Sequence, residues 1–196
     1  MRIGLFGGSF DPVHLGHLLV AQAAREELAL DRLFFIPAAQ SPFKPASEPA
    51  SPTLRLRLLR LALAGQSSCE IDEQEIARGG VSYTIDTARH YAARFAVAEL
   101  FYLIGADHVP SLPKWREAEA LARLVHFVVI PRPGEDPVAL PAPFRLEVLT
   151  GWPLKVSSSQ IRARVQAGQR IDHLVPGTVA AAIAETHAYL PRTDLA

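Results

Sequence analysis

The sequence predicts an α/β fold of the doubly wound kind, in which helices flank a mostly parallel sheet and further helices close the chain. Short apolar runs alternate with segments of helical periodicity along the chain. The runs are apolar throughout, as expected for parallel strands that are buried on both faces. Strand, helix and strand follow one another within residues 2–36, and this order implies a parallel pair with a right-handed crossover.

The first half of the chain supplies three of the expected strands and two of the helices. Its first apolar run ends at Gly7-Gly8, and the leucines and alanines after His14 recur at helical spacing. Pro37 stops the second run and begins a proline-rich loop, and Gly65 ends the leucine-rich helix that follows it. In order, we expect strand 2–6, helix 15–28, strand 33–36, loop 37–53, helix 53–65 and strand 69–71.

The second half continues this alternation, without repeats or low-complexity segments. The strand over 100–104 is again followed by glycine, and a second proline-rich loop follows the next apolar run. Together the strands form a Rossmann-like sheet. In order, we expect helix 84–95, strand 100–104, helix 117–124, strand 126–130, loop 131–143, strand 144–151 and helices 158–167 and 177–188.

Composition indicates one globular domain over residues 1–196. Basic and acidic residues balance at 20 each, so no overall field favours nucleic acid or an anionic membrane, and we expect neither as a partner. Cys69 is the single cysteine and cannot form an internal disulfide. We find no signal peptide and no apolar segment of membrane-spanning length, and therefore expect a cytoplasmic protein. No feature of the sequence determines an oligomeric state.

The stretch IGLFGGSFDPVHLGH, residues 3–17, carries the strongest functional signal. Its glycines stand at the carboxyl end of a predicted strand, where open parallel sheets bind ligands, and the next helix offers free N–H groups to phosphate. His14 and His17 are three residues apart, so both can face a phosphoryl group. Glycines after a strand are common in α/β turns, and a histidine pair is more often structural. A metal site is not favoured, because no carboxylate or third histidine lies at helical spacing beside this pair.

A second candidate site lies in VSSSQIRARVQAG, residues 156–168. Ser157 and Gln160 have the spacing of a capping box, which predicts the start of a helix. The serine hydroxyls and free N–H groups there can bind an anion, and Arg162 follows within the first turns. A well-capped surface helix is the alternative reading. The two stretches together form the two parts of a phosphate clamp.

These motifs resemble a known family. GGSFDPVHLGH and SSSQIR are similar to the nucleotidyltransferase superfamily that carries an HxGH motif and a late serine-rich helix start ending in arginine. SYTIDT (82–87), LIGADHVPSLPKW (103–115), PRPG (131–134) and LVPGTVAAAI narrow the resemblance to the bacterial nicotinate-nucleotide adenylyltransferases. The resemblance runs from Met1 to about Leu190. SYTIDT and the later GAD…W pair are its most specific part.

The resemblance implies a reaction between nicotinate mononucleotide and ATP. The mononucleotide phosphate attacks the α-phosphorus in line, which gives nicotinate adenine dinucleotide, the precursor of NAD, and pyrophosphate. Such chemistry depends on positioning and charge stabilisation. Mg²⁺ would bridge the ATP phosphates rather than occupy a protein cage.

The resemblance also implies which residues bind ATP. His14, His17 and Arg162 would be catalytic, with the histidines on the ATP phosphates and Arg162 on the leaving pyrophosphate. Bound phosphate would favour the charged imidazoles. The other implied ATP-binding residues are Gly7, Gly8, Ser9 and Phe10 through their backbone, Ser158 and Ser159 on the β- and γ-phosphates, and Gly105 and Asp107 at the adenosine.

The mononucleotide would be bound by a different set. Ser82, Tyr83 and Thr84 would present hydroxyls and backbone N–H groups to the nicotinate carboxylate, and Trp115 would stack on the pyridine ring. A partly buried core aromatic is the alternative for Trp115, plain packing for Tyr83, and a helix cap or turn for Asp107.

Several basic residues have less defined roles. Lys44 matches a residue that the family uses near the phosphates, but Phe43 stands where the family often has histidine. Arg55 could bind substrate phosphate or belong to a solvated helix face with its neighbouring arginines. Arg132 could approach a phosphate or remain at the surface.

Two other function classes stay open on the sequence. A sister adenylyltransferase would act on phosphopantetheine or nicotinamide mononucleotide and shares both phosphate motifs. A non-catalytic nucleotide-binding module would share the fold without turnover. The intact histidines and Arg162 favour an enzyme.

Overall fold

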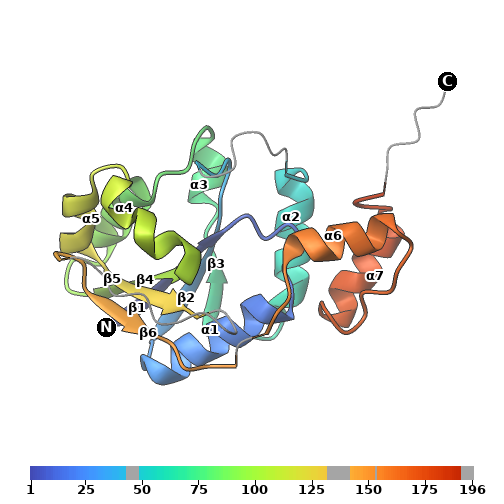
Figure 1. Ribbon diagram of the computed structural model, residues 1–196, viewed down its shortest axis with the longest axis horizontal. Helices are drawn as coiled ribbons and strands as arrows, with labels where there is room; N and C mark the ends of the chain where they lie inside the picture. Colours follow the sequence, from blue (N-terminus) through green and yellow to red (C-terminus); the bar gives the residue numbers. More distant parts are fainter. Residues whose placement is uncertain (43–48, 132–141, 153, 191–196) are drawn as a thin grey trace.

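Six parallel strands form a sheet in the order β3-β2-β1-β4-β5-β6, which confirms the doubly wound prediction (Figure 1). The computed structural model describes residues 1–42, 49–131, 142–152 and 154–190. The strands are short, and all but β3 and β6 are mostly apolar. The predicted strands lie within one or two residues of the observed ones except at the last. The strands are β1 (Arg2–Gly8), β2 (Arg32–Pro37), β3 (Cys69–Ile71), β4 (Glu99–Gly105), β5 (His126–Ile130) and β6 (Leu146–Val148).

Helices cover both faces of the sheet. Successive side chains of a strand point to opposite faces, so each apolar strand presents apolar side chains to both layers of helices. Leu5 and Phe34 face a core that they share with α4, η1 and α5, whereas Phe6 and Phe35 face the core under α1 and α2. The C-terminal helices α6 and α7 extend this second layer beside α2 (Figure 1). The helices are α1 (Leu15–Glu27), α2 (Pro52–Ala62), α3 (Gln74–Arg78), α4 (Thr84–Arg94), η1 (Ala106–Lys114), α5 (Ala118–Leu124), α6 (Ser158–Gln166) and α7 (Gly177–Glu185).

Two short helices were not predicted from the sequence. α3 has only five residues, too few to show a helical period. η1 is a 3₁₀ helix that contains Pro110 and Pro113, which read as breakers of an α-helix. The predicted loops over 37–53 and 131–143 lie partly outside the described residues. Within the described part of the chain, no helix is long and apolar enough to cross a membrane.

The strand order places the candidate site. β1 runs between β2 on one side and β4 on the other, so the chain changes direction across the sheet at the β1–β4 boundary. Crevices at such a switch point bind ligands beyond the carboxyl ends of the strands. In register, Gly8 lies opposite Pro37, and Gly105 opposite Ile130, so both predicted glycine turns open at this edge.

Candidate active site

The two glycines that end β1 are required by close packing. A Cβ at Gly7 would collide with the hydroxyl of Tyr102, and one at Gly8 would lie 3.1 Å from the Phe10 ring. Phe10 is buried and has a φ of 46°, a left-handed conformation that is unusual for a bulky residue. The turn thus directs the aromatic ring into the core and leaves the backbone of residues 7–10 at the sheet edge.

His14 and His17 lie together at the start of α1. His14 is the N-cap residue, and its backbone N–H donates to Nδ1 of His17 over 3.1 Å. The two imidazoles stack with ring centroids 3.6 Å apart. Phe10 packs edge-on against His17 at 5.0 Å and fixes its orientation. The structure therefore brings the predicted pair together, although His14 precedes the helix instead of lying within its first turn.

Burial favours the neutral form of both imidazoles. Burial lowers the pKa of His14 from 6.5 to about 4, and His14 is only 6% exposed. Burial, and then repulsion from His14, lower the pKa of His17 well below 6.5. The sequence alone pointed to imidazoles near their ordinary pKa. A neutral imidazole still donates one N–H bond to a phosphoryl oxygen.

The start of α6 adjoins the β1–α1 loop. Ser157 and Gln160 form the predicted capping box, with Ser157 Oγ accepting from the Gln160 N–H over 3.2 Å and Gln160 Oε1 accepting from the Ser157 N–H over 2.9 Å. Ser158 Oγ donates to the carbonyl of Pro12 over 2.8 Å. The helix start is therefore hydrogen-bonded directly to the loop between Gly8 and His14.

Arg162 completes this connection. Its Nη1 donates to the carbonyl of Asp11 over 2.6 Å, and its Nη2 donates to Ser159 Oγ over 3.4 Å. The guanidinium is partly exposed at the edge where His14 and His17 lie. Two stretches of sequence some 150 residues apart, both predicted to bind phosphate, are thus joined by hydrogen bonds.

A buried polar group behind the loop was missed by the sequence analysis. The Asp11 carboxylate is 4% exposed and accepts hydrogen bonds from the Tyr189 hydroxyl over 2.8 Å and from the Ala50 N–H over 3.2 Å. Asp11 stood inside a motif that we had singled out, so its position was the available signal. Nothing in the sequence indicated Tyr189, which is 178 residues away.

Arg55 also belongs to this buried group, and the prediction that it lies on a solvated helix face was wrong. Arg55 is 1% exposed, and its guanidinium donates to the carbonyls of Ser9 over 2.7 Å and Ala50 over 3.1 Å. Burial lowers its pKa, which nearby Asp11 opposes. The solvated-face prediction does hold for its neighbour Arg57, which pairs at the surface with Glu185.

The residues predicted for the nicotinate end lie at the start of α4. Ser82 is buried, and its Oγ accepts from the Ala39 N–H over 3.0 Å. Thr84 Oγ1 lies 3.5 Å from the Tyr102 hydroxyl, beneath Gly7. Tyr83 packs partly buried against the core, and its ring carries the Arg116 guanidinium at 4.7 Å.

Gly105, Asp107 and Trp115 follow β4. Asp107 is exposed in the first turn of η1, and a Cβ at Gly105 would lie 2.5 Å from its Oδ1. Trp115 comes directly after η1 and is partly buried. Its indole N–H donates to Ser111 Oγ over 3.0 Å, and its ring meets Phe127 edge-on at 6.1 Å. This agrees with the partly buried aromatic that we had considered, and part of the ring remains accessible.

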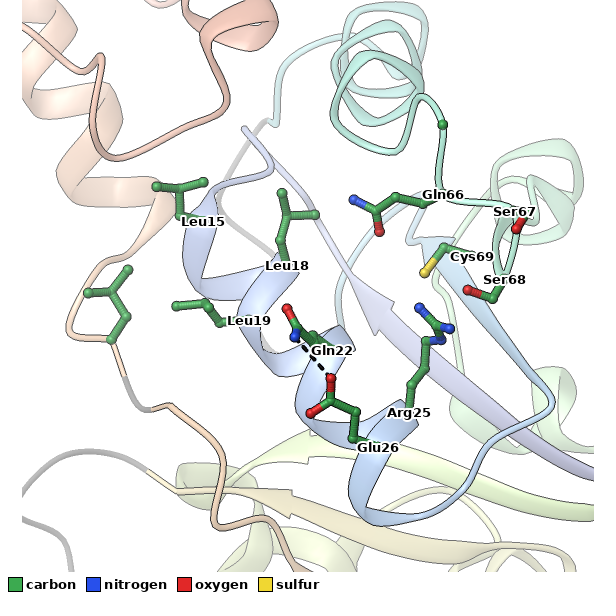
Figure 2. A pocket seen from close by; sticks show the side chains of 12 residues that line it. Leu15, Leu18, Leu19, Gln22, Arg25, Glu26, Gln66, Ser67, Ser68 and Cys69 are labelled. Atoms are coloured by element: carbon green, nitrogen blue, oxygen red, sulfur yellow. Dashed lines mark hydrogen bonds between the residues drawn. The ribbon is translucent and has the colours of Figure 1, made fainter.

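The predicted residues Phe43, Lys44 and Arg132 lie outside the described residues. A hollow of about 550 Å³ lies between α1 and the turn before β3. Figure 2 shows the side chains that line it, among them Leu15, Leu18 and Leu19 of α1. Of the predicted site residues that the structure describes, none lines it. No group of three His, Cys, Asp or Glu side chains in the described ranges could hold a metal ion.

Comparisons with known proteins agree with this geometry. Residues 5–164 match the family described as cytidylyltransferase-like. A "probable nicotinate-nucleotide adenylyltransferase" of Opitutus terrae is 43% identical over 97% of this chain and 99% of its own length. One of Gemmatimonas aurantiaca is 44% identical over 96% and 92%.

The fold also matches a solved structure. The nicotinic acid mononucleotide adenylyltransferase of Plasmodium falciparum, solved with NaAD, superposes with a TM-score of 0.79 at 17% identity. The superposition covers 96% of this chain and 97% of that one. At this identity the likeness concerns the fold.

Proposed function

This chain belongs to the nicotinate-nucleotide adenylyltransferase family, within the cytidylyltransferase-like proteins, and we propose that its two phosphate motifs form one ATP site. The enzyme joins nicotinate mononucleotide to the AMP part of ATP and releases pyrophosphate, a reaction of NAD biosynthesis. The observation that carries the site proposal is the contact between Arg162 and the Asp11 carbonyl, since it places the late arginine beside the histidine loop.

We assign the phosphate chemistry to the side chains at this contact. The mononucleotide phosphate attacks the α-phosphorus of ATP in line, and the negative charge that moves onto the β-phosphate must be stabilised. His14 and His17 donate hydrogen bonds to the ATP phosphates. Arg162 and the hydroxyls of Ser158 and Ser159 bind the departing pyrophosphate, and the backbone of residues 7–10 lets the nucleotide approach closely.

Mg²⁺ belongs to the ATP substrate in this proposal. The side chains assigned to the phosphates are two imidazoles, an arginine and serine hydroxyls, which suit phosphate oxygens better than a hard cation. Phosphate-bound Mg²⁺ neutralises charge on the transferred and leaving groups. The residues of the chain need only position the phosphates around it.

For the mononucleotide we assign the region between α4 and η1. The start of α4 offers free backbone N–H groups near Tyr83 and Thr84, and helix N-termini favour a carboxylate over a neutral amide. Ser82, just before α4, fixes this turn because its Oγ accepts a hydrogen bond from the Ala39 N–H. The accessible part of the Trp115 ring would stack on the pyridine, and Gly105 and Asp107 would contact the adenosine.

We also propose the cytoplasm as the working compartment. The reaction consumes ATP, and the single cysteine, Cys69, is a free and buried thiol, as is usual in reducing compartments. Nucleic acid and membranes have no part in the proposed reaction.

The test offers the purified protein MgATP with nicotinate mononucleotide, nicotinamide mononucleotide or phosphopantetheine and identifies the product by mass. We expect dinucleotide chiefly from nicotinate mononucleotide. An equal rate with nicotinamide mononucleotide would contradict the proposed carboxylate site at α4, but the protein would still be an adenylyltransferase. Product from phosphopantetheine alone would move the protein to a sister activity, and ATP binding without any product would indicate a non-catalytic module.

A further inference from the structure

The carboxylate of Asp11 is held from three separate segments of the chain. Tyr189 donates to Oδ1 over 2.8 Å, and the Ala50 N–H, just before α2, donates to Oδ2 over 3.2 Å. Nη1 of Arg162 lies 3.7 Å from Oδ2 while it donates to the backbone carbonyl of the same residue. Arg55 supplies a second nearby positive charge.

A turn after α7 brings Tyr189 to this position. α7 ends at Glu185, and both His187 and Tyr189 then adopt left-handed backbone conformations, with φ of 50° and 68°. Such conformations are unfavourable for these residues and persist where tertiary contacts compensate. Burial and the Asp11 carboxylate raise the pKa of Tyr189, so its hydroxyl stays protonated and donates. The end of the described chain is thus turned back onto the loop between Ser9 and His14.

Asp11 and a bound pyrophosphate would compete for the same guanidinium. Both are anionic, and Arg162 has its Nη1 within 3.7 Å of Asp11 Oδ2. Hydrogen bonds that a carboxylate accepts already stabilise its negative charge, so the carboxylate gains less from an arginine. Tyr189 and Ala50 occupy one lone pair on each oxygen of Asp11. Removing the Tyr189 hydroxyl would leave Oδ1 unsatisfied in a buried place and strengthen the pull of Asp11 on Arg162.

We propose that Tyr189 is a positioning residue of the adenylyl transfer, whose hydroxyl restrains the Asp11 carboxylate and so keeps the Arg162 guanidinium available to pyrophosphate. The proposal rests on the function assigned above. It connects the last helical turn of the chain to the leaving-group side of the site. Tyr189 touches no substrate in this account and acts only through Asp11.

The test compares Tyr189→Phe with Thr178→Val. Phenylalanine keeps the ring and removes only the hydroxyl. Thr178 Oγ1 donates to the Leu61 carbonyl, so valine there also removes a hydrogen bond of α7, to α2 rather than to Asp11. We expect Tyr189→Phe to weaken pyrophosphate binding and raise its KM in the reverse reaction about tenfold. The KM for the dinucleotide should change less than about twofold, and Thr178→Val should leave both values within that range.

A double-mutant cycle tests the route through Asp11. In an Asp11→Asn background the competing charge is absent, so we expect Tyr189→Phe to add less than about a twofold loss of pyrophosphate binding. Equal losses for pyrophosphate and dinucleotide, or the same loss in Thr178→Val, would overturn the proposal in favour of a purely structural role. Binding is measured by calorimetry, so this result does not depend on turnover. A wild-type protein that makes no dinucleotide would contradict the proposed function instead.

Discussion

The phosphate side of the site is joined by contacts that span more than 150 residues, whereas the contacts on the mononucleotide side span shorter stretches, such as the 43 residues between Ala39 and Ser82. Arg162 and Tyr189 bind Asp11 across 151 and 178 residues. By contrast, Trp115 bonds to Ser111 four residues away, and Thr84 approaches Tyr102 across 18 residues. The first region also contains the buried acid Asp11 beside the buried base Arg55, while the second contains the partly exposed aromatics Tyr83 and Trp115.

This difference corresponds to two different tasks. Transfer of an adenylyl group requires donors that are already in place when charge develops, and buried, multiply bonded residues move little. Recognition of a pyridine ring requires only a flat accessible surface and a few N–H groups. We therefore expect substitutions on the phosphate side to impair the reaction or the fold strongly, and substitutions on the mononucleotide side to alter substrate affinity.

The largest effect is expected at His17. Replacing it with alanine removes a donor to the ATP phosphates, and comparable losses reduce kcat by about 10²–10³-fold. The rate of dinucleotide formation measures this, and circular dichroism checks that the fold is intact. An active, folded His17→Ala variant would contradict its catalytic role and remove the distinction between the two regions.

The next effect concerns stability. Arg55→Met leaves the Ser9 carbonyl and the Asp11 carboxylate without their buried cation, and we expect the free energy of unfolding to fall by about 3 kcal/mol. Arg57→Met, on the same helix, removes a surface ion pair and should cost less than about 1 kcal/mol. Urea unfolding compares the two variants. If both variants lose the same free energy of unfolding, the buried contacts of Arg55 do not stabilise the loop between β1 and α1 more than a surface ion pair does.

The two regions should also respond to pH in opposite directions. The pKa of His14 is lowered to about 4 in the folded protein, so the unfolded chain binds more protons between pH 6.5 and 4 and stability falls as pH is lowered through this range. Across the whole range this amounts to about 2–3 kcal/mol. Asparagine can still cap the helix but does not titrate. In His14→Asn, the free energy of unfolding, measured at each pH, should therefore fall less between pH 6.5 and 4.

Glu75 provides the contrast on the mononucleotide side. It is 3% exposed, accepts from Thr87 Oγ1 over 2.5 Å, and has its pKa raised by burial. A raised carboxyl pKa stabilises the folded protein below pH 4.5, and this contribution is lost as pH rises through the folded-state pKa. In Glu75→Gln, the free energy of unfolding should therefore no longer fall as pH rises above 4.5. Its fall between pH 6.5 and 4, which depends on His14, should be unchanged.

The smallest effect is expected at Trp115. Alanine there removes a stacking surface, and we expect the KM for nicotinate mononucleotide to rise about tenfold while the KM for ATP changes little. Trp115→Phe retains an aromatic face and should lose less. Steady-state kinetics with each substrate varied in turn measures both values. If the two KM values rise together, Trp115 supports the core against Phe127 and does not bind the pyridine.

Local pattern was sufficient for most of the fold because its elements bury simple apolar faces. β1 and β4 are apolar runs that end in glycine, and the Ser157 capping box defines the start of α6. α3 and η1 escaped prediction because one is a single turn and the other contains prolines. The site motifs were visible for the same reason: His14 and His17 are close in the sequence.

The alternating strands and helices, the glycine turns and the two phosphate motifs could all be predicted, since each depends on neighbouring residues. Folding brings Arg162 to the loop before His14, buries Arg55 and turns Tyr189 onto Asp11, and none of these contacts could be predicted. Folding also lowers the pKa of both histidines by burying them. Burial, and the pKa values and hydrogen bonds that depend on it, arise from residues distant in the chain, and no local pattern contains that information.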